Sequence, residues 1–134
     1  MSNQAKLSLQ CRLSETTVGT GEDHYMVIPC AGEWKLKAAY FCPSAATTGH
    51  ASNTATLAVK QGSTAVVTAI LIDDGSSGTN GCTAGTKLTF TVPASAGASL
   101  EFGQGDILHI DINKAASGVA VLGDFTFAFD QIVS

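Results

Sequence analysis

Three histidines, His24, His50 and His109, are the residues of this chain best suited to general acid-base chemistry. A histidine beside a serine or cysteine nucleophile would support hydrolysis or acyl transfer. The histidines lie far apart, and no serine or cysteine stands in a G-x-S-x-G segment or a phosphate-binding loop. A Ser-His-Asp triad can assemble from distant segments, but nothing in the sequence favours one. We therefore expect no catalytic residues and no enzyme.

Metal binding is the second chemistry that the polar residues suggest. His109 and Asp111 are two positions apart in an alternating segment, so both side chains lie on one face of the expected strand. A cupin-like centre would need further histidines nearby, and the sequence has none there. Segment 73–75 (Asp-Asp-Gly) and Asn80 resemble an oxygen-rich calcium loop but lack its spaced acids and final Glu. We expect no metal and no cofactor, and interpret these residues as a polar strand face or subunit contact and as a solvated turn.

The four cysteines are Cys11, Cys30, Cys42 and Cys82, and no two of them have the C-x-x-C spacing of zinc or redox sites. Full pairing would leave three connectivities open, and their spacing does not choose among these. The N-terminal segment lacks the basic start and apolar run of a signal peptide. We therefore expect free, mostly buried thiols in a reducing cytoplasm.

Composition excludes several other classes of protein. The chain has 134 residues, which suits one domain. Its net charge of −4 with 7 basic residues predicts no nucleic-acid partner, and no apolar run predicts a membrane span. Charged residues make up only 13%. They are nearly absent from the loops at 43–58 and 75–86, so these loops are suited to packing against other chains with little desolvation of charge.

Alternation of apolar and polar residues is the dominant pattern, and no segment has a sustained helical stripe. It predicts an all-β fold, an antiparallel β-sandwich of about eight strands separated by turn-rich loops. The segment 65–72 is apolar on both faces, as expected of a fully buried strand. A brief strand is expected at 119–122, and a loop at 14–23. The expected strands span residues 6–13, 24–28, 33–42, 55–59, 65–72, 88–92, 99–102, 107–113 and 125–133.

The alternation also assigns faces. In segment 6–13 the leucines and Cys11 lie inward, while the outward face carries Lys6, Ser8, Gln10 and Arg12. In segment 33–42 Trp34, Tyr40 and Cys42 are expected in the core and Phe41 on the outside. An outward aromatic indicates a partner surface or burial beneath a loop. Tyr25 is a further candidate for exposure.

The order of several segments resembles the small jelly-roll structural proteins of tailed bacteriophages, especially capsid decoration (cement) proteins. The resemblance covers about residues 30–134. The segments are Trp34–Tyr40 (WKLKAAY), Thr54–Gly62 (TATLAVKQG), Leu88–Phe90, the turn Gly103–Asp106 (GQGD), Ile107–Ile112 (ILHIDI) and a terminal strand that alternates Phe.

The resemblance implies a single jelly-roll domain over residues 1–134 that forms a homotrimer on the virion surface. Such a protein is made in the host cytoplasm, binds the major capsid protein and stabilises the shell. Residues 1–30 would form an N-terminal strand or arm that contacts partner subunits. The expected capsid or subunit contacts are Lys6, Ser8, Gln10, Arg12, Tyr25, Phe41, His109 and Asp111. The alternative is a carbohydrate- or receptor-binding β-sandwich module of a tail fibre, which requires exposed aromatic side chains.

Overall fold

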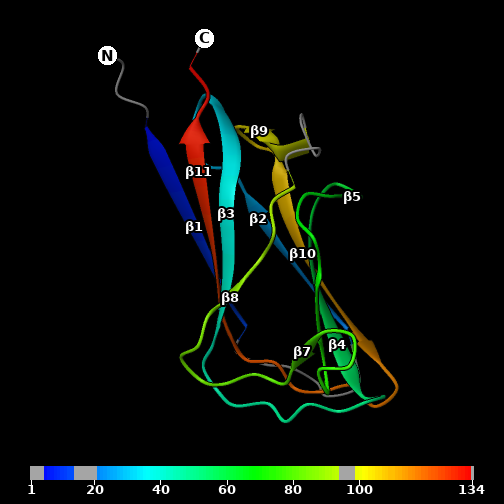
Figure 1. The fold of residues 1–134 in the computed structure, drawn as a ribbon. Helices are drawn as coiled ribbons and strands as arrows, with labels where there is room; N and C mark the ends of the chain where they lie inside the picture. Colours follow the sequence, from blue (N-terminus) through cyan, green and yellow to red (C-terminus); the bar gives the residue numbers. More distant parts are fainter. Residues whose placement is uncertain (1–4, 14–20, 94–98, 134) are drawn as a thin grey trace.

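The computed structural model describes residues 5–13, 21–93 and 99–133. These residues form two sheets packed as a β-sandwich, which confirms the predicted all-β class (Figure 1). The first sheet, sheet A, contains β1 (Lys6–Leu13), β3 (Glu33–Pro43), β8 (Leu88–Thr89), β9 (Glu101–Gly103) and β11 (Gly123–Gln131). The second, sheet B, contains β2 (Glu22–Val27), β4 (Thr54–Gln61), β5 (Thr64–Ala65), β6 (Ile70–Asp73), β7 (Thr79–Asn80) and β10 (Ile107–Ala115).

Each sheet has a long edge strand near the start of the chain. Sheet A has the order β1-β11-β3-β8, and sheet B the order β2-β10-β4-β6-β7. Among the described strands, β1 pairs with β11 alone and β2 with β10 alone, both antiparallel. Their outer edges therefore carry backbone groups outside the ladders. The described part of the chain contains no helix long and apolar enough to cross a bilayer.

One apolar cluster fills the space between the sheets. The predicted inward faces are confirmed at Phe125, Phe127 and Phe129 from sheet A and at Leu108, Ile110 and Ile112 from sheet B, all of which are buried. Burying a side chain of this size contributes roughly 1.5–3 kcal/mol. Alternation of apolar residues with polar ones along β10 and β11 therefore fixes which face of each strand meets the other sheet.

A β-bulge in β3 reverses part of the predicted pattern. Phe129 pairs with Leu36 but Ala128 pairs with Ala38, so Lys37 is an extra residue on β3. An extra residue moves every following side chain to the opposite face. The expected outward position of Phe41 is therefore wrong: it is fully buried and its ring packs against that of Phe125, with centroids 4.7 Å apart.

The same bulge turns two residues out of the expected core. Cys42 is exposed, and Tyr40 is only partly buried. The ammonium of Lys87 lies 4.6 Å from the centre of the Tyr40 ring, a cation–π contact on the outer face. Trp34 precedes the bulge and keeps its predicted core position.

Three other sequence-based expectations differ from the structure. The segment 65–72 is not one buried strand, because Val66 and Val67 are buried while residues 68 and 69 are exposed between β5 and β6. Residues 119–122 form no strand. The loop expected at 14–23 ends earlier, since β2 begins at Glu22; its part at 14–20 lies outside the described residues.

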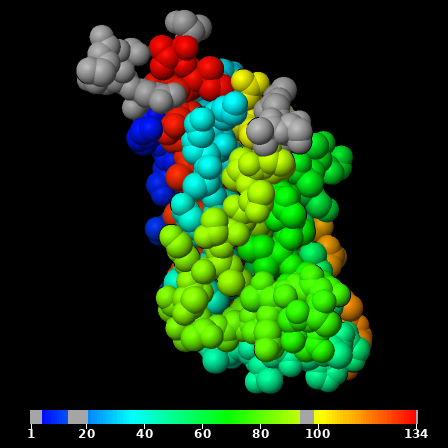
Figure 2. All heavy atoms as spheres, viewed as in Figure 1, coloured from blue at the N-terminus to red at the C-terminus, as the bar shows by residue number. Residues whose placement is uncertain are grey.

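Charge-free loops gather at one end of the elongated molecule (Figure 2). The segment 44–53 pairs with the segment 75–86 through Thr47 and Cys82, whose backbone groups exchange hydrogen bonds of 3.0 and 2.8 Å. Beside them, Asp73 is buried and its carboxylate accepts hydrogen bonds from the backbone amides of residues 75, 77 and 78. The expected solvated turn is therefore found at residues 74–78, which are exposed, whereas Asp73 itself is buried.

Candidate functional site

The residues expected to make contacts divide between the two outer faces of the sandwich. Lys6, Ser8, Gln10 and Arg12 lie on the exposed face of β1 in sheet A. The ammonium of Lys6 lies 2.6 Å from a carboxylate oxygen of Asp130, and the Arg12 guanidinium donates two hydrogen bonds to the carboxylate of residue 124. These ion pairs join β1 to β11, so both charged residues already have partners within the chain.

The remaining predicted contact residues, apart from the buried Phe41, lie together on sheet B. Asp23, Tyr25 and Val27 of β2 stand directly opposite Asp111, His109 and Ile107 of β10. All six side chains lie on the outer face of the sheet, because those of the intervening residues point toward the core side. We refer to these six residues as the β2–β10 surface.

The β2–β10 surface has an apolar half. Val27 is 56% exposed and Ile107, its partner in the ladder, is 46% exposed. Tyr25 is 64% exposed, and one face of its ring stacks on His109 with centroids 4.5 Å apart. These three residues are three of the four exposed large hydrophobic side chains in the described part of the chain. Exposed apolar side chains gathered in this way make the surface a candidate contact site.

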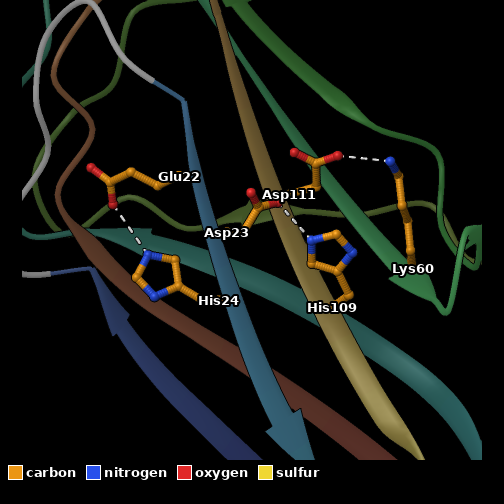
Figure 3. Close-up of polar contacts among 6 residues, drawn as sticks. All are labelled: Glu22, Asp23, His24, Lys60, His109 and Asp111. Carbon is orange, nitrogen blue, oxygen red and sulfur yellow. Dashed lines mark hydrogen bonds and ion pairs between the residues drawn. The ribbon is translucent and has the colours of Figure 1, made fainter.

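The other half of the β2–β10 surface is a polar network (Figure 3). His109 Nε2 lies 2.7 Å from Asp23 Oδ1, and Lys60 of β4 donates a 2.7 Å hydrogen bond to Asp111 Oδ2. That hydrogen bond lowers the pKa of Asp111 below its ordinary value and raises the pKa of the Lys60 ammonium. At neutral pH the network therefore contains a charged carboxylate and a charged ammonium side by side.

Asp23 belongs to this network, although the sequence predicted it in a loop. It meets Asp111 because β2 and β10 pair in one register over six residue pairs. The alternating pattern in this segment is recognisable only from Tyr25 onward, and Tyr25 and Val27 are apolar residues that point outward. The pattern therefore does not reveal that the strand begins at Glu22. The pairing of β2 with a strand more than 80 residues later is decided by tertiary structure.

His24 and His50 do not join the network. His24 Nε2 lies 3.1 Å from Glu22 Oε2 on the opposite face of β2, as Figure 3 shows. His50 Nδ1 accepts hydrogen bonds from the backbone amides of Ser52 and Asn53, so it caps its loop. The Ser52 hydroxyl lies 3.4 Å from this nitrogen. Because the nitrogen already accepts two amide hydrogens, it is poorly placed to take a proton from that hydroxyl.

A shallow hollow of about 270 Å³ beside the β3 bulge is lined by Lys35, Leu36, Lys37, Val92 and Leu100. Ligand-binding clefts are usually larger and mostly enclosed. None of the family models, curated proteins or solved structures compared with the chain matches it. The β2–β10 surface is therefore the feature on which a functional assignment rests.

Proposed function

We propose that the protein is a virion structural protein, a decoration protein that binds the outer surface of the major capsid shell as a homotrimer and stabilises it. The observation that carries this proposal is the clustering of Tyr25, Val27 and Ile107 on the β2–β10 surface. Burial of these apolar side chains by a second protein would favour association. The resemblance to phage decoration proteins supplies the partners: two further copies of the chain and the major capsid protein.

The pairing of the strands supports a jelly-roll interpretation of the sandwich. The first strand, β1, pairs with the last, β11, and β2 pairs with the last but one, β10. Toward the middle of the chain, β3 pairs with β8 and β9, and β4 with β6. Two interleaved Greek keys that return the end of the chain beside its beginning are typical of a jelly roll.

Two further features suit assembly. The outer edges of β1 and β2 lie outside the described ladders, so each is available for strand addition by a neighbour. This agrees with a contact role for residues 1–30. The loops at 44–53 and 75–86 contain no Asp, Glu, Lys or Arg, so a partner can cover these loops with little desolvation of charge.

The test combines electron cryomicroscopy of the parent virus particle with light scattering of the purified chain. We expect density for the chain on the outer shell and the mass of a trimer. A Tyr25→Ser/Val27→Thr/Ile107→Thr variant should lose both the trimer and the bound density. The matched control is Thr89→Ala/Thr126→Ala on the outer face of sheet A, outside the proposed contact residues, which should keep both. A particle without density for the chain, or a triple variant that assembles like the wild type, would refute the proposal.

Carbohydrate binding is the second candidate function, and the Tyr25 ring is the observation that favours it. One ring face stacks on His109, while the residue remains 64% exposed, which leaves a surface suited to stacking on a sugar. Asp23 of the same strand and Lys60, which pairs with His109, supply a carboxylate and an ammonium on this face of sheet B that could hydrogen-bond sugar hydroxyls. A glycan array on which binding disappears in Tyr25→Ser would favour this function over assembly.

A further inference from the structure

Asp23, His109 and Asp111 form a cluster of metal-ligating side chains on the β2–β10 surface. One ligand atom from each residue lies within 4.8 Å of the other two, and no other such group of three occurs among the described residues. His109 and Asp111 project from the same face of β10, and Asp23 stands opposite Asp111 on β2. Two paired strands of a sheet therefore hold all three ligands, so the cluster does not depend on a loop.

We propose that Asp23, His109 and Asp111 bind a divalent transition metal ion of the Zn²⁺ type. An imidazole nitrogen and two carboxylate oxygens are a mixed N/O set, which suits zinc and its neighbours in the first transition row. Mg²⁺ and Ca²⁺ prefer sets made of oxygen alone, so the histidine selects against them. Three protein ligands leave a coordination position for water or for a donor from a partner.

The exposure of the three side chains fits an ion that enters from solvent. The His109 and Asp111 side chains are 15% and 17% exposed, whereas that of Asp23 is 53% exposed. The two less exposed ligands lie on β10, which is flanked by β2 and β4, and stacking of Tyr25 on His109 fixes the imidazole plane. Asp23 forms the open side of the site, from which the ion would approach.

The charges of the two carboxylates also favour a cation here. Asp23 and Asp111 are directly opposite on antiparallel strands, and like charges in that position destabilise a sheet. Without a metal, the Lys60 ammonium neutralises Asp111, and His109 Nε2 lies 2.7 Å from the Asp23 carboxylate. A metal ion bound between the carboxylates of Asp23 and Asp111 would neutralise their charges.

Zn²⁺ could also bind at two other places on the chain, and the experiment must distinguish these from the proposed site. His24 and Glu22 form a histidine–carboxylate pair on the same strand, but within the described part of the chain no third ligand joins them. This pair is a matched control for adventitious binding to a histidine beside a carboxylate. Cys42 is an exposed thiol, and thiolates bind Zn²⁺ strongly. The titration therefore uses the full chain with its accessible thiols alkylated.

The experiment is a Zn²⁺ titration followed by ¹⁵N NMR of the imidazole nitrogens, in which His24, His50 and His109 give separate signals. We expect the ring nitrogen of His109 to shift and to saturate at one equivalent, while the other two histidines remain unchanged. Mg²⁺ should produce no shift. Asp23→Asn and Asp111→Asn should weaken binding at least about tenfold, a loss that second-shell substitutions alone can cause. His24→Gln should leave the affinity unchanged.

Two outcomes would overturn the proposal. One is a His109 signal that does not respond to Zn²⁺ or that moves together with His24 and His50 without saturating. The other is an Asp23→Asn variant that binds Zn²⁺ as tightly as the wild type. Asp23 is the most exposed of the three ligands, so this variant keeps the test decisive if Asp111→Asn does not fold. Amide spectra of each variant establish that the fold is intact.

Discussion

Asp23 and Asp111 occupy directly opposite positions on the antiparallel strands β2 and β10, so that two carboxylates share one rung of the sheet. Such a pair repels unless cations neutralise it. Lys60, from the strand on the other side of β10, donates a hydrogen bond to Asp111. The stability of this part of sheet B therefore depends on a charge supplied by β4.

Lys60→Met should lower Tm at pH 7. The difference in Tm between this variant and the wild type should be smaller at pH 3. The pKa of Asp111 is lowered by its hydrogen bond to Lys60, so this stabilisation is present above the unfolded pKa of about 3.9. It is lost as the pH falls through the lower folded value. The pKa of Lys60 is raised, so at the alkaline end stabilisation is lost only as the pH rises through that raised value.

Thermal unfolding of both proteins at pH 3, 5 and 7 measures this effect. Lys6→Met is the matched control, because the Lys6–Asp130 pair has no second carboxylate opposite it and Lys6 is more exposed. If Lys60→Met lowers Tm by the same amount at pH 3 and pH 7, the Lys60 ammonium does not stabilise the protein through the Asp111 charge.

Asp73→Asn should destabilise the protein by about 1–3 kcal/mol. The buried Asp73 carboxylate accepts hydrogen bonds from three backbone amides, and the substitution replaces one of its two acceptor oxygens with an NH₂ group, which donates. Asp74→Asn is the control: Asp74 is exposed and accepts a hydrogen bond from the amide of Ser76. Urea unfolding should show a clear loss for the first variant and little change for the second. If both variants lose the same free energy of unfolding, the burial of Asp73 does not explain its contribution to stability.

Phe41→Ala should cost about 3–5 kcal/mol, since the ring is fully buried against Phe125 and its removal leaves a cavity. At concentrations where the chain is monomeric, Tyr25→Ser should change the free energy of unfolding by less than about 1 kcal/mol, because Tyr25 is mostly exposed in the single chain. Chemical denaturation of the two variants separates a core aromatic from a surface aromatic. A Tyr25→Ser loss as large as that of Phe41→Ala would show that Tyr25 is structural.

Iodoacetamide should modify Cys42 well before Cys82. Cys42 is exposed, whereas Cys82 is buried, and that burial raises the pKa of its thiol. Burial also raises the pKa of Cys11, with a smaller contribution from Asp124. A higher pKa leaves less of the reactive thiolate at pH 8. Peptide mass spectrometry over time measures the order, and in urea the difference should disappear. Equal labelling rates in the native protein would contradict the burial of Cys82.

Period-two patterning determined the architecture of the strands that face the core on one side. The alternating apolar residues of β1, β10 and β11 predict their positions and inward faces, because burial of one face requires that pattern. The same reasoning predicted that Tyr25, His109 and Asp111 lie outward. These expectations depend only on residues that are neighbours along the chain.

Tertiary structure alone decided where that pattern breaks and which strands meet. The bulge at Lys37 reverses the faces of Tyr40, Phe41 and Cys42, and its position is set by pairing with β11, about 90 residues further along. Asp23 joins His109 and Asp111 only because β2 pairs with β10 in one register. Local alternation carries no information on long-range register, so the sequence identified two members of the polar cluster and could not identify the third.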